Sequence, residues 1–590
     1  MTSRLERHAS IEKLRSHRKA VLDEDVQALL ADLDTTTLVA EIEPLVPNDR
    51  GPKRHLNVRG LLLGMSLCSA LRSGTVTLCA VADLLAFGLS DAFRTQFDIP
   101  WYPDNDYGFE AFYAVVRRLF HKIIDAIDPS PLPKNHRLGL NYAAELEARA
   151  DRDLLAHKRT LLLRVANHVL GMSLLHAHPL LEGTWGGHYV VDATVVGTYA
   201  KGLAADSEET STDPDAGWYV RTARHEDPLA LDKLAAPPPQ AKKGTKPASK
   251  TKKKPRLKKK LYGFDASLIV ARDPEHDGAP LPDGSANPDV VPALIFAFSV
   301  EKPSHRPGEV AIEALQHVDP RYPRGYLAGD RLYNDQKPEN FQLPIRAMGY
   351  QPVYDYAKDQ LGSKGEFGGA QLIEGNWYCP SMPTHLVTAT SDLIAKRIDK
   401  QTWIQRIRAR TAHLLMPKEK ADAEGHRRMM CPAQAQRLQC ILKPHTLGSG
   451  VEIPLLDIIP SPTAPPPVCK QRSMTVPPEA GAALWQPLQY GHDMWQRVYF
   501  RLRNSIEGVN GFAKDPLHER LESAGTRRIR GIAAQTILLA FQLAHANRRK
   551  LAAWADAVAL KGERPRRRPT RRRETKPIGT WTPTGFVQQT

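Results

Sequence analysis

Apolar residues recur at helical spacing along the first 130 residues of the chain. Between positions 21 and 33 they stand three or four residues apart, which places them on one face of a helix. The segments 61–71, 78–87 and 109–127 show the same spacing, and prolines follow several of them. Residues 1–140 are therefore predicted to form a helical N-terminal domain. Such a domain could bind DNA, or it could serve only for packing or dimerisation.

After residue 180 the pattern changes from helical spacing to short runs rich in β-branched residues, which are typical of strands. Residues 141–180, just before this change, are predicted to be one or two connecting helices. The predicted strands are 188–197, 218–221, 261–271, 293–300, 325–330 and 350–356, with a helix at 310–318. Strands with interspersed helices predict an α/β layer over residues 181–360.

The C-terminal part of the chain first loses and then regains its periodicity. Residues 361–480 gain Pro, Gly and Cys, and they are predicted to form an irregular inserted subdomain. Strong helical patterning returns at 484–515 and 526–557. Residues 481–557 are therefore predicted to supply the C-terminal helices of the α/β domain.

The net charge of +16 is concentrated in two short segments. Residues 242–260 hold eleven Lys/Arg and no acid, inside a basic loop predicted at 236–260. Residues 561–576 hold nine Lys/Arg and two Glu, inside a tail predicted at 558–590 to be disordered. Such segments attract polyanions by releasing counterions, which favours a nucleic-acid partner. A solubilising linker and tail would carry the same charge.

Other features of the sequence bear on the compartment. Six cysteines in 590 residues are too few for a disulfide scaffold. Residues 1–18 alternate charges and lack the apolar core of a secretory signal. The most apolar stretch, residues 60–89, contains Arg72 and Asp83 and therefore predicts buried helices and not a membrane span. We expect a cytoplasmic, nucleoid-associated protein with no membrane partner.

Three acidic residues occupy positions that suggest chemistry. Asp192 lies in the middle of an apolar strand, and Asp330 ends another. A charge on a buried strand is costly unless it is paired or binds a metal. Glu507 lies on a helix with apolar side chains on the opposite face. The charged face of that helix also carries Arg503, Asn510 and Lys514.

Carboxylates brought together from two strands and a helix could hold two Mg²⁺ or Mn²⁺ ions, because hard cations prefer oxygen ligands. Two such ions stabilise both the attacking and the leaving oxygen of a phosphodiester displacement. Arg503 and Lys514 would then lie beside the ions, where DNA phosphates must run. A chain with 65 acidic residues also offers such combinations by chance, so the pattern alone leaves an incidental grouping open.

The stretch YFRLRNSIEGVNGFAK, which ends at Lys514, resembles the Tyr-Arg-Glu-Lys signature of insertion-sequence DDE transposases. In that family an Arg precedes the catalytic Glu by four residues and a Lys follows it by seven. Arg503 and Lys514 stand at these two spacings from Glu507. Tyr499 stands one residue earlier than the family's Tyr, whose position is taken by Phe500.

Two further stretches are similar to the family's catalytic strands. VVDAT around Asp192 looks like the first, and AGDRLY around Asp330 looks like the second. Leu332 replaces a residue that is often Gly in the family. The order Asp, Asp, Glu and the long interval before Glu507 also fit.

The resemblance implies an RNase-H-like α/β catalytic domain with a helical N-terminal domain and an insertion before the last catalytic helix. It implies that Asp192, Asp330 and Glu507 bind two Mg²⁺ or Mn²⁺ ions and cut double-stranded DNA at transposon ends. Water would attack first, and the freed 3′-hydroxyl would then attack target DNA. A homodimer on DNA is expected, because two ends must be brought together. The expected DNA contacts are Arg503, Lys514, Tyr499, Asn510 and Arg331.

Two other functions fit the same sequence. A two-metal nuclease of the same fold would cut DNA without joining strands. An inactive DNA-binding protein derived from a transposase would bind the ends and cut nothing.

Four cysteines fall inside the predicted insertion: Cys379, Cys431, Cys440 and Cys469. Four thiols in an irregular segment could bind a structural Zn²⁺ ion. The chain contains no Cys-x-x-Cys pair, however, which favours buried or incidental thiols.

Overall fold

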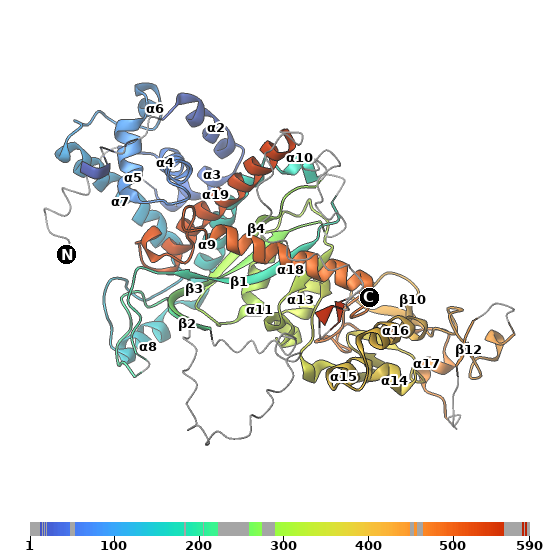
Figure 1. Ribbon diagram of the computed structural model, residues 1–590. Helices are drawn as coiled ribbons and strands as arrows, with labels where there is room; N and C mark the ends of the chain where they lie inside the picture. The colour runs from blue at the N-terminus through green and yellow to red at the C-terminus, as the bar shows by residue number, and fades with distance from the viewer. Residues whose placement is uncertain are drawn as a thin grey trace, which may run out of the picture.

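The computed structural model of the chain is shown in Figure 1. It describes residues 12–14, 16, 18, 21–47, 54–181, 185–204, 206–221, 259–273, 290–448, 453–456, 464–559, 581–582 and 585–586. Most of the predicted basic loop at 236–260 and of the predicted tail at 558–590 lies outside the described residues.

A mixed β-sheet occupies the middle of the chain (Figure 1). Strand β1 (Tyr189–Gly197) lies antiparallel to β3 (Lys259–Ala271) and parallel to β5 (Tyr326–Gly329). Strand β5 pairs in parallel with β6 (Gln351–Val353). The first half of β1 is buried, and its run of β-branched residues is typical of a strand covered on both faces.

Two more strands complete the sheet and confirm the predicted α/β layer. Strands β2 (Gly217–Arg221) and β4 (Leu294–Glu301) pair antiparallel with different stretches of β3. Helix α11 (Pro307–Leu315) follows β4, slightly earlier than the helix predicted at 310–318. Pro307 at its first turn explains the early start, because proline is favoured there.

The N-terminal region is helical, as its apolar spacing predicts. Its α-helices include α2 (Asp23–Asp34), α3 (Leu38–Ile42), α4 (Val58–Leu71), α5 (Leu78–Asp83), α6 (Asp91–Gln96) and α7 (Asp106–Ile127). Asn57 and Asn105 cap α4 and α7 by accepting a backbone N–H each. No helix in the described part of the chain is long and apolar enough to cross a bilayer.

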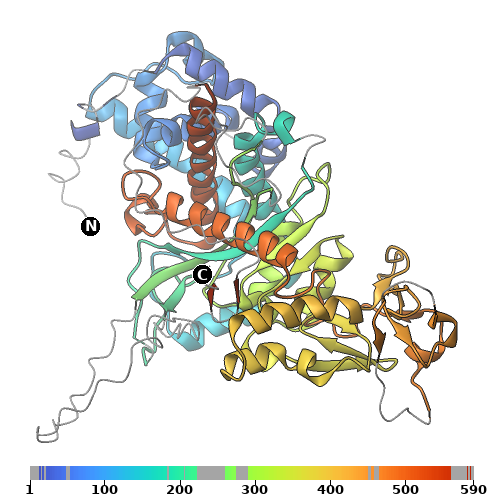
Figure 2. The same cartoon turned by 45° about the vertical axis from the view of Figure 1, so that its right-hand side comes forward.

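Two long C-terminal helices, α18 (Asp493–Ala513) and α19 (Ile532–Ala559), return to the first half of the molecule. Helix α18 runs across β1 and β5, and α19 packs against α9 (Arg152–Gly171) and α4 (Figures 1 and 2). Ahead of α19, the backbone N–H of Gly531 donates to Asp213 at 3.1 Å. One apolar core includes residues of the N-terminal helices, the sheet and both C-terminal helices.

The connecting segment and the insertion differ in how well the sequence predicts them. The two connecting helices that the sequence allows are α8 (Leu140–Arg149) and α9, and a short third helix, α10 (His178–Leu181), follows them. The insertion has more regular structure than predicted, and Figure 2 shows it as a separate yellow and orange lobe. Its strands have two to five residues, which is too short for a hydrophobic period to be visible in the sequence. These strands include β7 (Ser363–Phe367), β8 (Ala370–Ile373), β9 (Asn376–Tyr378), β11 (Arg427–Met430) and β14 (Met474–Val476). The insertion also contains helix α16 (Lys400–Arg410).

Candidate active site

Strand register brings the two predicted aspartates together. Strands β1 and β5 are parallel, and their last paired residues are Val191 and Gly329. Asp192 and Asp330 each come directly after this pair, so both stand at the same edge of the β1–β5 ladder. Helix α18 passes over these two strands and carries Glu507. The fold therefore gathers three acids that are spread over more than three hundred residues of sequence.

One guanidinium lies among all three acids. Arg503 Nη1 stands 3.6 Å from Asp192 Oδ2. Arg503 Nη2 stands 3.7 Å from Asp330 Oδ2 and 3.6 Å from Glu507 Oε1. Burial lowers the pKa of Arg503, but the facing carboxylates outweigh it and hold this pKa above its usual value. We call Asp192, Asp330, Glu507 and Arg503 the acidic site.

Asp192 is the most buried acid of the site. Its side chain is 20% exposed, whereas those of Asp330 and Glu507 are 43% and 61% exposed. Burial raises the pKa of Asp192 to about 6, and the negative charges of Asp330 and Glu507 add to this against the opposing effect of Arg503. The acidic site therefore runs from a buried carboxylate outward to an exposed one.

The donors of the acidic site fit divalent cations in kind and charge. All three acids offer carboxylate oxygens, and one arginine cannot neutralise three carboxylates. The contacts to Arg503 are also longer than hydrogen bonds, and in the structure its buried Nη1 has no hydrogen-bond partner. The carboxylate oxygens of the three acids must move closer to one another in order to bind the same ion. Elsewhere in the described ranges, Asp422, Glu424 and His426 already have ligand atoms within 4.8 Å of one another, and they lie at the surface. They are the one such group of three or more His, Cys, Asp or Glu residues in those ranges.

No protein-family model, curated protein or solved structure matches the chain. Its function therefore has to be argued from the site itself.

Two of the predicted DNA contacts are cations that are already paired with acids. Lys514 Nζ stands 3.2 Å from Glu522 Oε1. Arg331 Nη2 stands 2.6 Å from Asp355 Oδ2. Both cations keep part of their side chain exposed, at 31% for Lys514 and 44% for Arg331. A phosphate would share these cations with the acids that they now face.

Arg503 belongs to the acidic site, and the remaining two predicted DNA contacts lie inside the protein. Tyr499 is 7% exposed, and its ring stacks on Trp495 with centroids 4.9 Å apart. Asn510 is 9% exposed, and its Nδ2 donates to Asp192 Oδ2 at 3.2 Å. Tyr499 therefore anchors α18 in the core, and Asn510 orients the buried carboxylate of the acidic site.

Sequence reasoning missed a buried arginine that braces this region. Arg527 is 1% exposed and donates to the backbone carbonyls of Gly197 at 3.3 Å and Leu521 at 2.7 Å. Burial lowers the pKa of Arg527 to about 9. These bonds tie the end of β1 to the segment after α18. Arg527 stands next to Arg528 in the sequence, a pattern typical of exposed basic surface, so no local signal reveals its burial.

The four cysteines of the insertion lie in its own apolar core, away from the acidic site. All four are buried and none forms a disulfide.

Proposed function

We propose that this chain is a DDE-class transposase, which cleaves DNA at the ends of an insertion sequence and joins those ends to target DNA. The observation that carries the proposal is the meeting of Asp192, Asp330 and Glu507 around Arg503. The same four residues carry the resemblance to the family's motifs.

The arrangement of the mixed sheet supports an RNase-H-like catalytic domain as part of this proposal. Asp192 lies in β1, Asp330 directly follows the adjacent parallel strand β5, and Glu507 comes from a helix laid across both strands. Carboxylates on three separate elements can be held rigidly, which a displacement at phosphorus needs. The insertion comes between β6 and α18, before the helix that carries Glu507.

The acidic site would hold two Mg²⁺ or Mn²⁺ ions, with oxygens of Asp192, Asp330 and Glu507 as ligands. Bound there, the ions would supply positive charge beside the attacking and leaving oxygens. Asn510 would keep the Asp192 carboxylate oriented through its 3.2 Å hydrogen bond. Arg503 would be free to turn toward a DNA phosphate once cations neutralise the acids that it now faces.

The reaction has two displacements at phosphorus. In the first, the oxygen of water bonds to a phosphorus at the transposon end, and the 3′-oxygen leaves as a hydroxyl group. In the second, that hydroxyl bonds to a phosphorus of target DNA and displaces the target's own 3′-oxygen. Double-stranded DNA is therefore both substrate and partner. The proposal includes a homodimer on DNA and a location at the nucleoid.

The test is cleavage and joining of DNA that carries the gene's own flanking sequence, with Mg²⁺ or Mn²⁺. Wild type is compared with Glu507→Gln and with Asp493→Asn, a control on the same helix that removes an acid outside the acidic site. Wild type and Asp493→Asn should cut and join, whereas Glu507→Gln should bind the DNA and do neither.

Three outcomes would overturn the proposal in different ways. Equal activity of wild type and Glu507→Gln would show that Glu507 is not catalytic. Cleavage without joined products would identify a nuclease. Tight binding of true ends without cleavage by any form would identify an inactive DNA-binding protein.

A further inference from the structure

The four cysteines of the insertion come from distant segments and line one small cavity. Cys379 follows β9, Cys431 follows β11, Cys440 lies in β12 (Gln439–Cys440), and Cys469 lies in α17 (Pro467–Lys470). Each of the four is between 4% and 6% exposed. The chain has six cysteines in all, so most of them meet at this one point of the insertion.

Backbone N–H groups and one lysine lie beside the sulfurs. The backbone N–H of Ser381 lies close enough to the Cys379 sulfur, and those of Leu442 and Lys443 to the Cys440 sulfur, to oppose part of the rise in pKa that burial causes. N–H groups placed in this way stabilise negative charge on sulfur and help to orient metal ligands. Lys443 itself lines the cavity and is 5% exposed, with Nζ donating to the backbone carbonyl of Gln471 at 2.8 Å.

The buried ammonium of Lys443 needs a negative charge nearby to offset its own. Neutral thiols would leave this ammonium in an apolar core without a counter-charge at this cavity, which is costly. A divalent ion bound by four thiolates carries a net charge of −2, and the ammonium would offset part of it.

The local fold around the cavity also lacks strong backbone support. Strand β12 and its partner β13 (Leu455–Leu456) have two residues each, and α17 has four. Elements this short are stable only when something else fixes them, and small lobes often use a metal for this. At this cavity β12 and α17 meet the ends of β9 and β11, and each of these four elements supplies or precedes one of the cysteines.

We propose that Cys379, Cys431, Cys440 and Cys469 bind one structural Zn²⁺ ion that holds the insertion together. Four sulfur ligands and a buried location are typical of structural zinc. No three of these sulfurs lie within 4.8 Å of one another, whereas Zn–S bonds of about 2.3 Å place tetrahedral sulfurs about 3.8 Å apart. Binding therefore draws the thiols together and closes the cavity.

The experiment measures metal in the full-length protein. Zinc per chain is determined by mass spectrometry after expression with zinc and extensive dialysis. The protein is then loaded with Co²⁺, whose absorption shows sulfur-to-cobalt charge transfer and tetrahedral geometry. We expect one zinc per chain and a four-sulfur Co²⁺ spectrum. Wild type without zinc and without that spectrum would overturn the proposal, even if every cysteine variant failed to fold.

Variants separate this ion from other sites. Cys431→Ser and Cys469→Ser should lose the zinc, whereas Cys68→Ser, a buried cysteine of α4, should keep it. Asp192→Asn should also keep it, because the acidic site plays no part. Zinc lost from Asp192→Asn and kept by Cys431→Ser would contradict the assignment and leave the cysteines as packing residues.

Discussion

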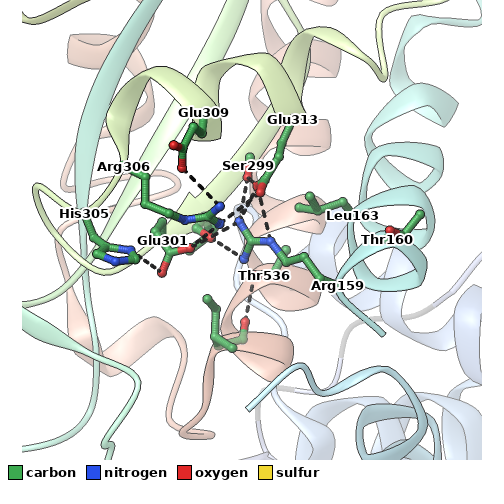
Figure 3. Close-up of polar contacts among 12 residues, drawn as sticks. Arg159, Thr160, Leu163, Ser299, Glu301, His305, Arg306, Glu309, Glu313 and Thr536 are labelled. Atoms are coloured by element: carbon green, nitrogen blue, oxygen red, sulfur yellow. Dashed lines mark hydrogen bonds and ion pairs between the residues drawn. The ribbon is translucent and has the colours of Figure 1, made fainter. Parts of the chain in front are cut away.

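Two clusters of charged side chains in this protein are built in opposite ways. In the first, Arg159 and Arg306 face Glu301 and Glu313 between β4, α11 and α9 (Figure 3). Glu313 stands 2.6 Å from Arg159 and 2.9 Å from Arg306. We call these four residues the ion-pair network. In the second cluster, the acidic site, three carboxylates share one arginine at 3.6–3.7 Å.

The difference separates a structural cluster from one suited to chemistry. Burial alone would raise the pKa of Glu313, but Arg159 and Arg306 outweigh it and hold this pKa below its usual value. The pKa of Asp192 is instead raised to about 6, because burial and two neighbouring acids outweigh Arg503. Charge is matched in the ion-pair network and left in excess at the acidic site. Excess buried negative charge is the condition that a bound cation relieves.

The largest expected effect on stability is at the ion-pair network. Glu313→Gln leaves two partly buried arginines short of a counter-charge, and it should lower the free energy of unfolding by about 3 kcal/mol. Urea unfolding at neutral pH measures this. The exposed neighbour Glu309, 3.4 Å from Arg306, is the control, and Glu309→Gln should cost well under 1 kcal/mol. Equal costs for the two variants would contradict the contrast between the clusters.

Removing a carboxylate from the acidic site should raise the free energy of unfolding and not lower it. Asp192→Asn removes a charge that the fold disfavours, and it should raise the free energy of unfolding by about 2 kcal/mol at pH 7.5 without divalent metal. Asp330→Asn should stabilise less, because Asp330 is more exposed. A loss of stability in Asp192→Asn would mean that its charge is already satisfied.

The pH dependence of these two effects sharpens the comparison. The folded pKa of Asp192, about 6, lies above its ordinary value of 3.8, so its charge opposes folding fully above pH 6. The gain in Asp192→Asn should therefore fade as the pH drops from 7 toward 4. The folded pKa of Glu313 is lowered, so its contribution is present at neutral pH and is lost as Glu313 protonates in acid. In unfolding measured between pH 8 and pH 4, the gain in Asp192→Asn should shrink, whereas the loss in Glu313→Gln should stay nearly constant down to about 4.5, the ordinary pKa of Glu, and shrink only below it. A pH-independent gain in Asp192→Asn would be evidence against a raised pKa.

Much of the scaffold follows from the sequence alone. Strands β1, β3 and β4 and helices α7, α18 and α19 are long enough for their apolar pattern to show. The strands and α7 begin and end within three residues of the prediction, whereas α18 and α19 begin nine and six residues later than the predicted helices at 484–515 and 526–557. The insertion is different, because its elements are too short to show a period and its fold depends on contacts between distant segments. A local exception occurs inside the predicted helix at 78–87, where residues Leu84–Gly88 wind as a π-helix.

The candidate site is predictable in part for the same reason. Asp192 and Asp330 stand out because each lies in or ends an apolar run, and Glu507 stands out by its spacing from Arg503 and Lys514. Their shared contact with Arg503 and the inward position of Asn510 depend on how α18 crosses the sheet, which no local spacing encodes. The meeting of the four cysteines is hidden in the same way, since they lie on elements that contact only through the tertiary fold.

The smallest expected effect concerns the arginine of the acidic site. Arg503→Gln removes the one positive charge among three acids, and it should lower the free energy of unfolding by about 1 kcal/mol without metal. Saturating Mn²⁺ should restore this loss, because a cation then supplies the missing charge. Thermal melts with and without Mn²⁺ measure both. If Mn²⁺ left the loss of stability in Arg503→Gln unchanged, the ion would not bind at the acidic site.

The most direct test of the central claim is Mn²⁺ binding to the DNA-free protein, measured by calorimetry. The forms compared are wild type, Asp192→Asn, Glu507→Gln and the control Glu309→Gln. We predict that wild type and Glu309→Gln bind Mn²⁺ alike, and that both acidic-site variants lose at least about tenfold in affinity. Equal binding by all four forms would contradict the claim that the acidic site is a metal site, and so would no binding by any of them.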